Sequence, residues 1–437
     1  MGRTNRTRAT ITVIRMTTDP ERSESNFDSK AHRDLSRRGL LLGAGGTGLA
    51  ATAAAAFGFG RSTAPAIDPR EPVHGTSTID FYGNRQAGID TPAQAHAVLL
   101  ALDLDRNDDP DAARRLLRLL SDDAARLTQG RPALADTEPE LAETPARLTV
   151  TFGFGPSLVR MLSPTSVPHW LRDLPHFDID RLESDLCGGD LLLQICGDDP
   201  VSVAHARRIL LKDARGYGAP RWIQDGFRSS RGARPRGETM RNLFGQVDET
   251  VQPRTSDGSR EFVVWGNPPP DSTSTVRPWI TDGTSLVVRL ISMDMDGWDE
   301  LSRRGKESSI GRDLRVGAPL TGVHETDEPD FEETSDMGFP VIEEFAHIRR
   351  AHPHAVEEQI LRRSYNYDRP PKDTDRISDT GQLFLSYQAD VVEQFLPIQQ
   401  RLAEGDRLNE WTTPIGSAVF AIPPGCRPGG YIGDCLT

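Results

Sequence analysis

The chain has 437 residues, of which 36% are apolar, and a formal net charge of −13 from 64 acidic and 51 basic side chains. This length allows two or three domains, and the acidic balance argues against a nucleic-acid-binding protein, which would present a basic face. The balance also disfavours anionic partners in general, although a local basic pocket can still bind an anion.

The first 70 residues are predicted to be a targeting segment followed by a flexible tail. Arg37 and Arg38 precede a mildly apolar run, rich in Ala and Gly, that reaches about Gly60. This pattern predicts a twin-arginine export signal, recognised by the twin-arginine machinery, and hence a secreted, extracellular or cell-envelope (periplasmic) protein. A membrane anchor is the alternative, because the run is just long enough to span a bilayer. Export in the folded state favours a protein that carries a cofactor.

The four cysteines form two local pairs, Cys187 with Cys196 and Cys426 with Cys435. Neither pair has the CxxC spacing typical of a metal site. The first pair flanks a predicted strand at 190–195, and an extended strand holds its two ends too far apart for a disulfide. The second pair encloses a glycine-rich loop and is the better disulfide candidate, a question that the sequence leaves open.

Strands and helices alternate in the same order in both halves of the chain. Hydrophobic periodicity and helix-start signals predict, in the first half, strands at 97–102, 148–152 and 190–195 and helices at 110–130 and 201–211. In the second half they predict strands at 285–291, 382–387 and 417–422 and helices at Trp298 and at 391–402. The segments 212–238, 268–270 and 324–336 are predicted loops, because they are rich in Pro, Gly or charged residues.

The strand at 190–195 begins 93 residues after the strand at 97–102, and the strand at 382–387 begins 97 residues after the strand at 285–291. We therefore predict an α+β protein built from two copies of one unit, each an antiparallel sheet covered by helices. A cleft between two such units would be a natural cofactor site. The alternative is that the similar order is accidental, since strand–helix alternation is common.

Among ten histidines, His347 stands out because it follows Phe345-Ala346 and precedes Ile348, a context in which the ring can be buried. A core histidine with a backbone partner is the alternative. HExxH, GxSxG and phosphate-binding glycine loops are absent from the sequence, which argues against zincin, serine hydrolase and P-loop functions. The carboxylate pairs Asp198/Asp199 and Asp294/Asp296 fit helix caps better than metal ligands.

Three stretches together suggest haem chemistry. His347 offers an imidazole for an iron, the later pair Arg362-Arg363 offers a fixed cation, and the stretch 242–248 offers Asp248 as a proton shuttle. Reduction of a peroxide at a haem needs an imidazole ligand on one face of the haem. It needs a fixed cation and a proton shuttle on the opposite face.

The same stretches carry a resemblance to a known family. Six motifs occur in this order: 241–248 (RNLFGQVD), 310–312 (IGR), 317–320 (GAPL), 347–349 (HIR), 360–365 (ILRRSY) and 416–420 (GSAVF). Over residues 78–437 the sequence resembles the dye-decolourising peroxidases of the exported type. The resemblance implies two ferredoxin-like modules of the dimeric α+β barrel type, at 71–235 and 236–437, with haem b in the second module. It also implies reduction of hydrogen peroxide and one-electron oxidation of organic donors such as dyes and phenolics. It leaves a homo-oligomer open.

Residue by residue, the resemblance places the proximal haem ligand on His347, the distal aspartate on Asp248 and the distal arginine on Arg362. It further implies haem contacts from Arg312, Phe384, Ser364 and Arg363, the last being the second choice for the distal arginine. The chain departs from the family pattern at Glu249, where the GxxDG motif has its final glycine. A second acid beside Asp248 is expected to raise the pKa of Asp248, and it replaces a residue that adopts positive φ freely.

Two other functions fit parts of this pattern. One is an exported haem-handling protein that removes iron, similar to a deferrochelatase, with weak peroxidase activity. The other is an exported binding protein of the same fold without haem. Bulky donors would need an electron relay, for which the sequence offers Trp265, Trp298, Trp411, Tyr365, Tyr367 and Tyr387, although core packing suits each of them as well.

Overall fold

The computed structural model describes residues 73–105, 109–235, 237–256, 258–266, 278–371 and 374–436. The predicted export signal at 1–70 and the predicted loop at 268–270 lie outside the described residues. Within the part of the chain that is described, no helix is long and apolar enough to cross a membrane.

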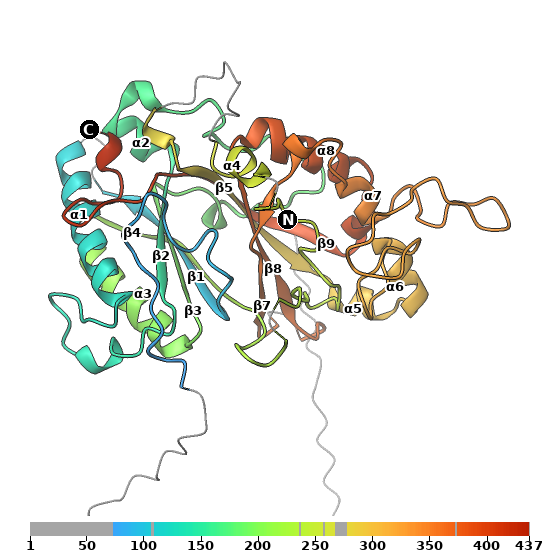
Figure 1. The fold of residues 1–437 in the computed structure, drawn as a ribbon, viewed down its shortest axis with the longest axis horizontal. Coiled ribbons are helices and arrows are strands. Elements are labelled where there is room, and N and C mark those ends of the chain that lie inside the picture. Colours follow the sequence, from blue (N-terminus) through green and yellow to red (C-terminus); the bar gives the residue numbers. More distant parts are fainter. Residues whose placement is uncertain are drawn as a thin grey trace, which may run out of the picture. The chain divides into compact units, whose positions relative to one another are not determined.

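The first half of the described chain forms a four-stranded antiparallel sheet with helices on one face (Figure 1). The strands are β1 (His96–Leu104), β2 (Thr149–Phe154), β3 (Leu191–Gly197) and β4 (Gly218–Phe227). Their order across the sheet is β2-β3-β1-β4. The helices are α1 (Pro110–Leu127), α2 (Pro156–Leu162) and α3 (Pro200–Ala214). Asp109 and Asp199 cap α1 and α3, each followed by proline, which suits the first helical position.

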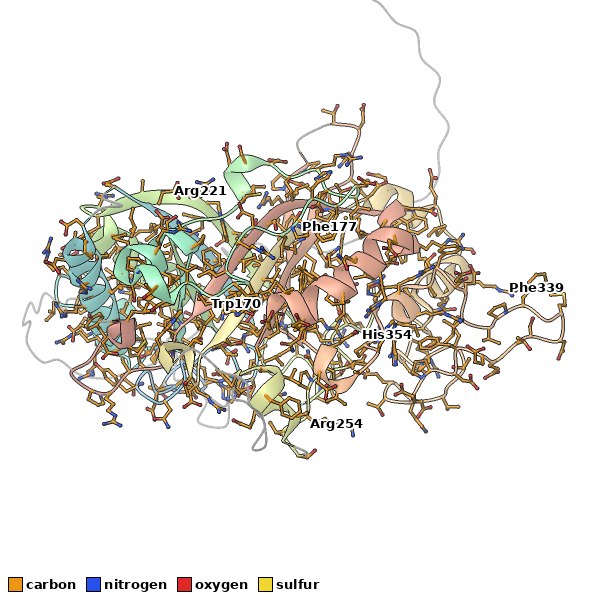
Figure 2. The ribbon with its side chains drawn as sticks, turned by 90° about the horizontal axis from the view of Figure 1, so that it is seen from above. Trp170, Phe177, Arg221, Arg254, Phe339 and His354 are labelled. Carbon is orange, nitrogen blue, oxygen red and sulfur yellow. The ribbon has the colours of Figure 1, made fainter. Side chains whose placement is uncertain are left out.

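The second half repeats this arrangement with a longer set of loops. Its strands are β5 (Thr284–Met293), β6 (Leu361–Arg362), β7 (Tyr365–Arg369), β8 (Asp379–Gln388) and β9 (Thr412–Ile422). The four longer strands lie in the order β9-β5-β8-β7, and β6 pairs with β8. The helices are α4 (Ser259–Val263), α5 (Met295–Asp299), α6 (Arg303–Ile310), α7 (His347–Ala351) and α8 (Leu396–Gly405). The predicted loop around 324–336 projects from this half, with Phe339 near its outer end (Figure 2).

The two halves join into one antiparallel sheet that closes on itself. β5 pairs with both β8 and β9, so the strands complete a ring. The halves meet at two short seams: β2 pairs with β9 through Phe154 and Ala421, and β4 pairs with β7 through Phe227 and Asn366. The α+β prediction is therefore confirmed at the level of a barrel-like antiparallel sheet with helices outside.

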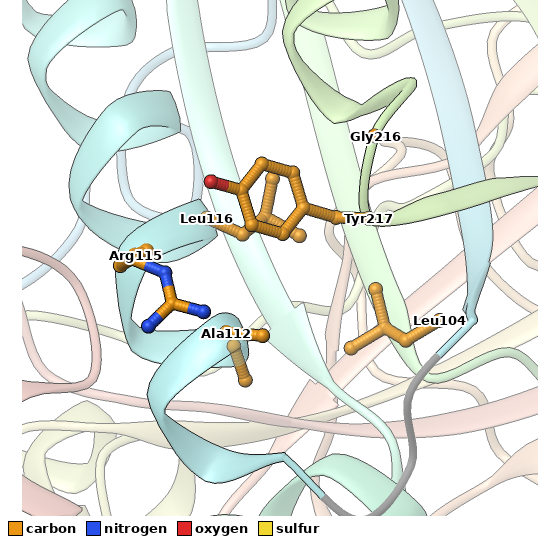
Figure 3. Close-up of a pocket in the computed structure, with 7 residues that line it drawn as sticks. Leu104, Ala112, Arg115, Leu116, Gly216 and Tyr217 are labelled. Carbon is orange, nitrogen blue, oxygen red and sulfur yellow. The ribbon is translucent and has the colours of Figure 1, made fainter.

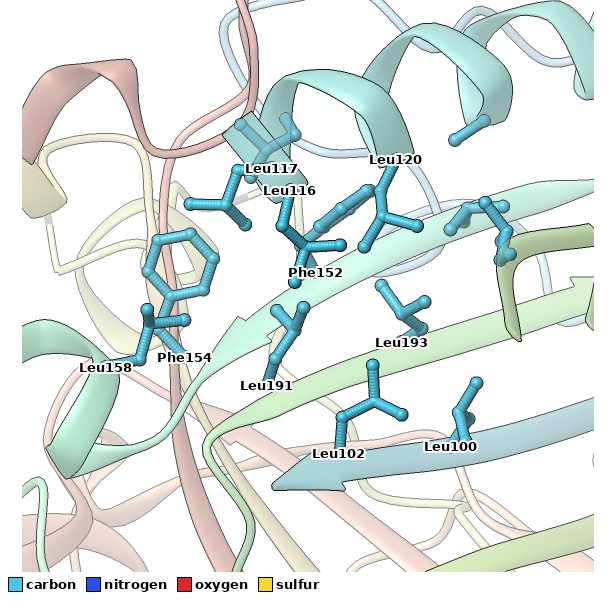
Figure 4. Close-up of a cluster of buried hydrophobic side chains, with 14 of the residues drawn as sticks. Leu100, Leu102, Leu116, Leu117, Leu120, Phe152, Phe154, Leu158, Leu191 and Leu193 are labelled. Atoms are coloured by element: carbon cyan, nitrogen blue, oxygen red, sulfur yellow. The ribbon is translucent and has the colours of Figure 1, made fainter. Parts of the chain in front are cut away.

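Side-chain alternation along the strands divides the core into an inner and an outer layer. On β1, Leu99 and Ala101 point into the barrel, whereas Leu100 and Leu102 point outward under α1. The outer layer packs Leu116, Leu117 and Leu120 of α1 against the sheet, as Figure 4 shows. Because both faces are buried, these strands are continuous apolar runs in the sequence.

One of the loop predictions was wrong. The segment 212–238, predicted to be an exposed loop, contains strand β4, in which Trp222, Gln224 and Gly226 are buried and alternate with exposed residues. The Arg, Gly and Pro residues of this segment obscured the alternation of buried and exposed positions in the sequence. Pro220 lies next to a register shift in the pairing of β4 with β1, which allows a proline within the strand. Between His347 and the arginine pair the chain forms the five-residue α7, followed by turns and β6.

The open question about the cysteines is answered in favour of thiols. Cys426 and Cys435 are unbonded, as are Cys187 and Cys196. The backbone around Cys426 is tied to the segment before β1, because Gly83 donates to the Cys426 carbonyl. Burial, with the nearby charge of Asp434, raises the pKa of both Cys426 and Cys435 to about 12, so these thiols stay protonated at neutral pH.

Candidate active site

Asp248 lies in a loop that is held in place by hydrogen bonds within the loop and to a neighbouring segment. The Asn242 side chain closes a turn by accepting the Gln246 N–H at 3.2 Å, and the Asp248 N–H donates to the Met240 carbonyl at 2.9 Å. The Arg241 guanidinium fastens the base of the loop to the carbonyls of Leu314 and Arg315. The loop is therefore a fixed support for one carboxylate.

The Asp248 carboxylate is held by side chains from two other segments and from its own loop. Its Oδ1 accepts from Arg362 Nη1 at 3.2 Å and its Oδ2 accepts from Gln382 Nε2 at 2.6 Å, with Asn242 Nδ2 at 3.5 Å. The backbone of Arg362 is fixed in turn, because Gln252 donates to its carbonyl at 2.8 Å and accepts its N–H at 2.9 Å. Asp248 and Arg362 remain 16% and 21% exposed, so both can be reached by a small molecule.

His347 begins α7 and pairs with an acid from a distant loop. Its Nδ1 lies 2.6 Å from Asp406 Oδ2, and Asp406 Oδ1 accepts the Leu408 N–H at 2.9 Å, which caps the short helix that starts at Arg407. Because a carboxylate only accepts, Nδ1 carries the proton in this pair. Among the described residues Nε2 has no hydrogen-bond partner, which leaves this nitrogen available as a ligand.

The charges of Asp248 and Arg362 both reach His347. Burial acts to lower the pKa of His347, but the charge and hydrogen bond of Asp406 outweigh it, and the pKa is raised. The charge of Asp248 raises this pKa further, and that of Arg362 lowers it. The imidazole is nevertheless 30% exposed. The three residues that the sequence singled out are thus close enough to interact electrostatically.

Arg312 brings a second cation to the same region. Its Nη1 donates to the carbonyls of Gly317 and Glu325, and among the described residues it forms no ion pair with a carboxylate. Burial, followed by the charge of Arg362, lowers the pKa of Arg312. A buried guanidinium beside another cation favours an anionic group next to it.

The remaining predicted residues occupy different places. Arg363 points into the barrel, where its guanidinium donates to the Thr91 carbonyl and to Gln94. Ser364 is buried, and its hydroxyl has no partner among the described residues. Phe384 lies two residues after Gln382 on β8, so both side chains share the outer face of the sheet.

Other features lie apart from these residues. A pocket of about 210 Å³ lies between α1 and the start of β4 and is lined by Arg115, Tyr217 and apolar side chains, without any predicted site residue (Figure 3). The six aromatic residues considered for an electron relay are all buried, so none of them is itself a surface entry point.

Sequence reasoning missed Asp406, Gln382 and the contacts of Glu249. Asp406 follows a helix and precedes Arg407-Leu408, which is a capping pattern, but nothing in the sequence connects it to a histidine 59 residues earlier. Gln382 lies in a strand that was predicted, and strand alternation puts it on the outward face, yet its partner cannot be read from periodicity.

Comparison with known proteins places this chain in a family. The models of the Dyp-type peroxidases match the chain at 86–228 for the N-terminal part and at 239–427 for the C-terminal part. A crystal structure of a DyP-type peroxidase from Cellulomonas bogoriensis is 49% identical, with a TM-score of 0.79 over 84% of this chain and 99% of that chain.

Two curated relatives have different names. The dye-decolorizing peroxidase of Thermobifida fusca (strain YX) is 36% identical over 421 residues, covering 92% of this chain and 97% of the relative. The deferrochelatase of Escherichia coli (strain K12) is 35% identical over 427 residues, covering 94% and 98%. The chain belongs to the Dyp-type peroxidase family. It is a haem-dependent peroxidase that reduces hydrogen peroxide with electrons from an organic donor.

Proposed function

We propose that His347 would bind the iron of a haem and that Asp248 and Arg362 act on hydrogen peroxide at this haem. The observation that carries this proposal is the mutual arrangement of two pairs, His347 with Asp406 and Asp248 with Arg362, whose charges act on one another. When bound, haem supplies the iron at which peroxide is reduced and through which electrons arrive from the donor.

The side chains present suit such a group. An imidazole whose Nδ1–H is held by a carboxylate presents Nε2 to a metal in a fixed direction, and the carboxylate makes the ligand more basic. Haem b carries two carboxylates, and the buried guanidinium of Arg312 has no carboxylate partner among the described residues. We therefore assign Arg312 to a haem carboxylate, while Phe384 supplies a partly exposed ring on the same face of β8 as Gln382.

Asp248 and Arg362 have distinct tasks. Asp248 takes the proton from one oxygen of peroxide and returns it to the other oxygen, which leaves as water. Gln382 and Arg362 each donate a hydrogen bond to one oxygen of the Asp248 carboxylate, which fixes the direction of that carboxylate. Arg362 stabilises the negative charge that develops as the O–O bond breaks, because its guanidinium is held in place beforehand.

The test compares neighbouring arginines. Arg362→Leu is expected to slow the reaction with peroxide by roughly 100-fold or more, because a fixed charge is lost. Arg363→Leu, the matched control, is expected to lower stability and leave this rate within a few fold. Stopped-flow absorbance of the Soret band on mixing with peroxide measures both. A larger loss of rate in Arg363→Leu than in Arg362→Leu would assign the charge-stabilising role to Arg363.

The ligand assignment has a separate test. His347→Ala is expected to abolish haem retention and the Soret band, because a haem-binding site loses its iron ligand. His352→Ala, which changes a nearby histidine beyond α7, serves as the control and is expected to keep normal haem content. A His347→Ala protein with a full complement of haem would contradict the assignment.

Iron removal from haem is the second candidate function, because several relatives with about the same identity are named deferrochelatase. The two activities differ in their product. Protoporphyrin that accumulates when the protein is incubated with haem supports iron removal, whereas consumption of peroxide with donor oxidation supports the peroxidase.

The division of the chain into two ferredoxin-like modules, at 71–235 and 236–437, is also part of the proposal. It is supported by the strand order, which in each half is fourth-first-third-second, and by the separate matches to the N-terminal and C-terminal parts of the family. Export by the twin-arginine route rests on Arg37 and Arg38. Exchange of both for lysine is expected to retain the protein inside the cell.

A further inference from the structure

Glu249 has a backbone conformation that disfavours its side chain. Its φ is +71°, and among the described residues only Ala146, Arg147 and Asp282 share a positive φ without being glycine. The left-handed conformation costs a residue with a Cβ atom roughly 1–2 kcal/mol, a cost that glycine escapes. The family pattern has glycine at this position, so the glutamate must provide contacts that glycine cannot.

The contacts of Glu249 form a closed ring. Its carboxylate accepts from Arg228 Nη2 at 2.8 and 2.9 Å and also accepts the backbone N–H of Ser364. Arg228 completes the ring, since its Nε donates to the Ser364 carbonyl at 2.6 Å. The Glu249 and Arg228 side chains are 9% and 13% exposed, and the Arg228 guanidinium lies over the Tyr365 ring. Charge-assisted bonds of this kind, shielded from water, are strong and directional.

This ring joins the two segments that carry Asp248 and Arg362. Glu249 follows Asp248 directly, and its own N–H donates to Asp248 Oδ1 at 2.7 Å. Ser364 lies two residues after Arg362. Gln252, three residues after Glu249, makes two hydrogen bonds to the backbone of Arg362. The loop of Asp248 is therefore attached to the segment of Arg362 at two points besides the Asp248–Arg362 contact itself.

We propose that Glu249 is a positioning residue that locks the Asp248 loop onto the Arg362 segment through Arg228 and Ser364. The proposal rests on the roles assigned above to Asp248 and Arg362. The carboxylate of Glu249 faces Arg228 and Ser364, so it acts on peroxide only through the placement of its neighbour. In this chain Glu249 replaces the glycine of the family pattern: its backbone is strained, and its side chain holds the Asp248 loop against the Arg362 segment.

The test separates placement from stability. Glu249→Gly removes both the backbone strain and the contacts of the carboxylate with Arg228 and Ser364. We expect its melting temperature to stay close to that of the wild type, because the relieved strain offsets the lost bonds. Its rate of reaction with peroxide should fall by about 10-fold or more, since misplacement by about 1 Å has large effects on catalysis. Hydrogen exchange of the haem-free protein, followed by mass spectrometry, should become faster in the peptides that cover 240–252.

A matched control and two further variants complete the design. Asp282→Gly also replaces an acid with positive φ that pairs with an arginine, Arg85, outside the candidate site, and it should leave the rate and the exchange at 240–252 unchanged. Glu249→Gln keeps an oxygen for Ser364 and Arg228 and should react within about threefold of the wild type. If Glu249→Gly does not fold, Glu249→Asn replaces it in the test. Asparagine tolerates positive φ, and its side chain is too short to reach Arg228 and Ser364.

The outcomes are distinct. The proposal is overturned if Glu249→Gly or Glu249→Asn keeps the wild-type rate and exchange. It is also overturned if Glu249→Gln is as slow as Glu249→Gly, because the charge and not the placement would then matter. Failure of the wild-type protein to react with peroxide, with haem bound, would instead contradict the function on which the proposal rests.

Discussion

At the scale of single residues, the acid that holds His347 decides how the imidazole meets a metal. Asp406 performs two tasks with its two oxygens, since one binds His347 Nδ1 and the other caps the helix that begins at Arg407. Asparagine at this position can keep the cap and lose the charge. A change to asparagine therefore isolates the electrostatic effect on the histidine from the effect on the local fold.

Asp406→Asn is expected to weaken haem retention by about 10-fold or more, because a ligand loses the charged partner that orients it. In the haem-free protein the pKa of His347 should fall, since the charge and hydrogen bond of Asp406 are what raise it. The rate of haem transfer to a scavenging apoprotein and a histidine titration by NMR measure the two effects.

The control for this prediction is Asp390→Asn. Asp390 also caps a helical turn and also pairs with a histidine, His169, at 3.2 Å. Its change should leave haem retention unaltered. Equal losses in both variants would mean that capping, and not the pairing with His347, is responsible.

The raised pKa of His347 also sets a pH dependence. In the haem-free protein the pair with Asp406 stabilises the fold fully below the ordinary histidine pKa of about 6.5, and this contribution is lost as the pH rises through the raised value. The stability difference between the wild type and Asp406→Asn should therefore be largest near pH 5 and shrink toward pH 9.

At the scale of secondary-structure elements, two carboxyl groups lie near each other between α1 and α3. Burial, followed by the neighbouring Asp123 carboxyl of α1, raises the pKa of Asp213 of α3 to about 7. Asp123 is buried and accepts the Leu134 N–H. The folded state therefore favours the protonated form of Asp213.

The sign of the resulting pH effect follows from linkage. A carboxyl whose pKa is higher in the folded state than in the unfolded state stabilises the fold at low pH, and this contribution is lost as the pH rises toward 7 and beyond. Asp213→Asn keeps a donor and removes the charge. It should therefore raise the free energy of unfolding at pH 8 by about 1 kcal/mol or more and change it little at pH 4.

Thermal unfolding of both proteins across this pH range checks the prediction. Asp122→Asn, which changes an exposed acid of α1 that pairs with Arg126, is the matched control and should show no such trend. A stability gain that is the same at pH 4 and pH 8 would mean that the pKa of Asp213 is not raised in the folded state.

The elements also differ in how far the sequence predicted them. The strands that became β1, β2, β3, β5, β8 and β9 were found because burial on both faces makes them long apolar runs. β4 and β7 were missed because their residues alternate between buried and polar, or are Tyr and Asn whose burial depends on the other half of the barrel. Asp406 was missed for the same reason, because its contact with His347 exists only after the chain folds.

At the scale of the whole molecule, the barrel consists of two well-paired sheets joined by little backbone pairing. The seams between the halves involve one residue pair each, Phe154 with Ala421 and Phe227 with Asn366. Within each half, the strands of the four-stranded sheet pair over many more residues. The halves are instead held by the inner core and by polar contacts across it, such as Tyr387 with Gln194 at 2.5 Å and Arg363 with Gln94.

This arrangement predicts how the halves behave when separated. The inner face of each sheet packs largely against the other half, so a fragment of residues 71–235 alone would expose apolar side chains such as Leu99 and Leu192 to water. Exposure of an apolar face of this size favours aggregation. We expect each fragment, 71–235 or 236–437, to be insoluble or partly folded alone, and both to form a soluble complex that binds haem when produced together.

Size-exclusion chromatography and circular dichroism of the separate and co-produced fragments measure this behaviour. Tyr387→Phe in the second fragment provides a graded control. It leaves Gln194 Oε1 without its partner in the core and should weaken the association of the fragments by about 1–3 kcal/mol. A fragment 71–235 that unfolds cooperatively as a soluble monomer would contradict the prediction, because its inner face would then be stable without the partner half.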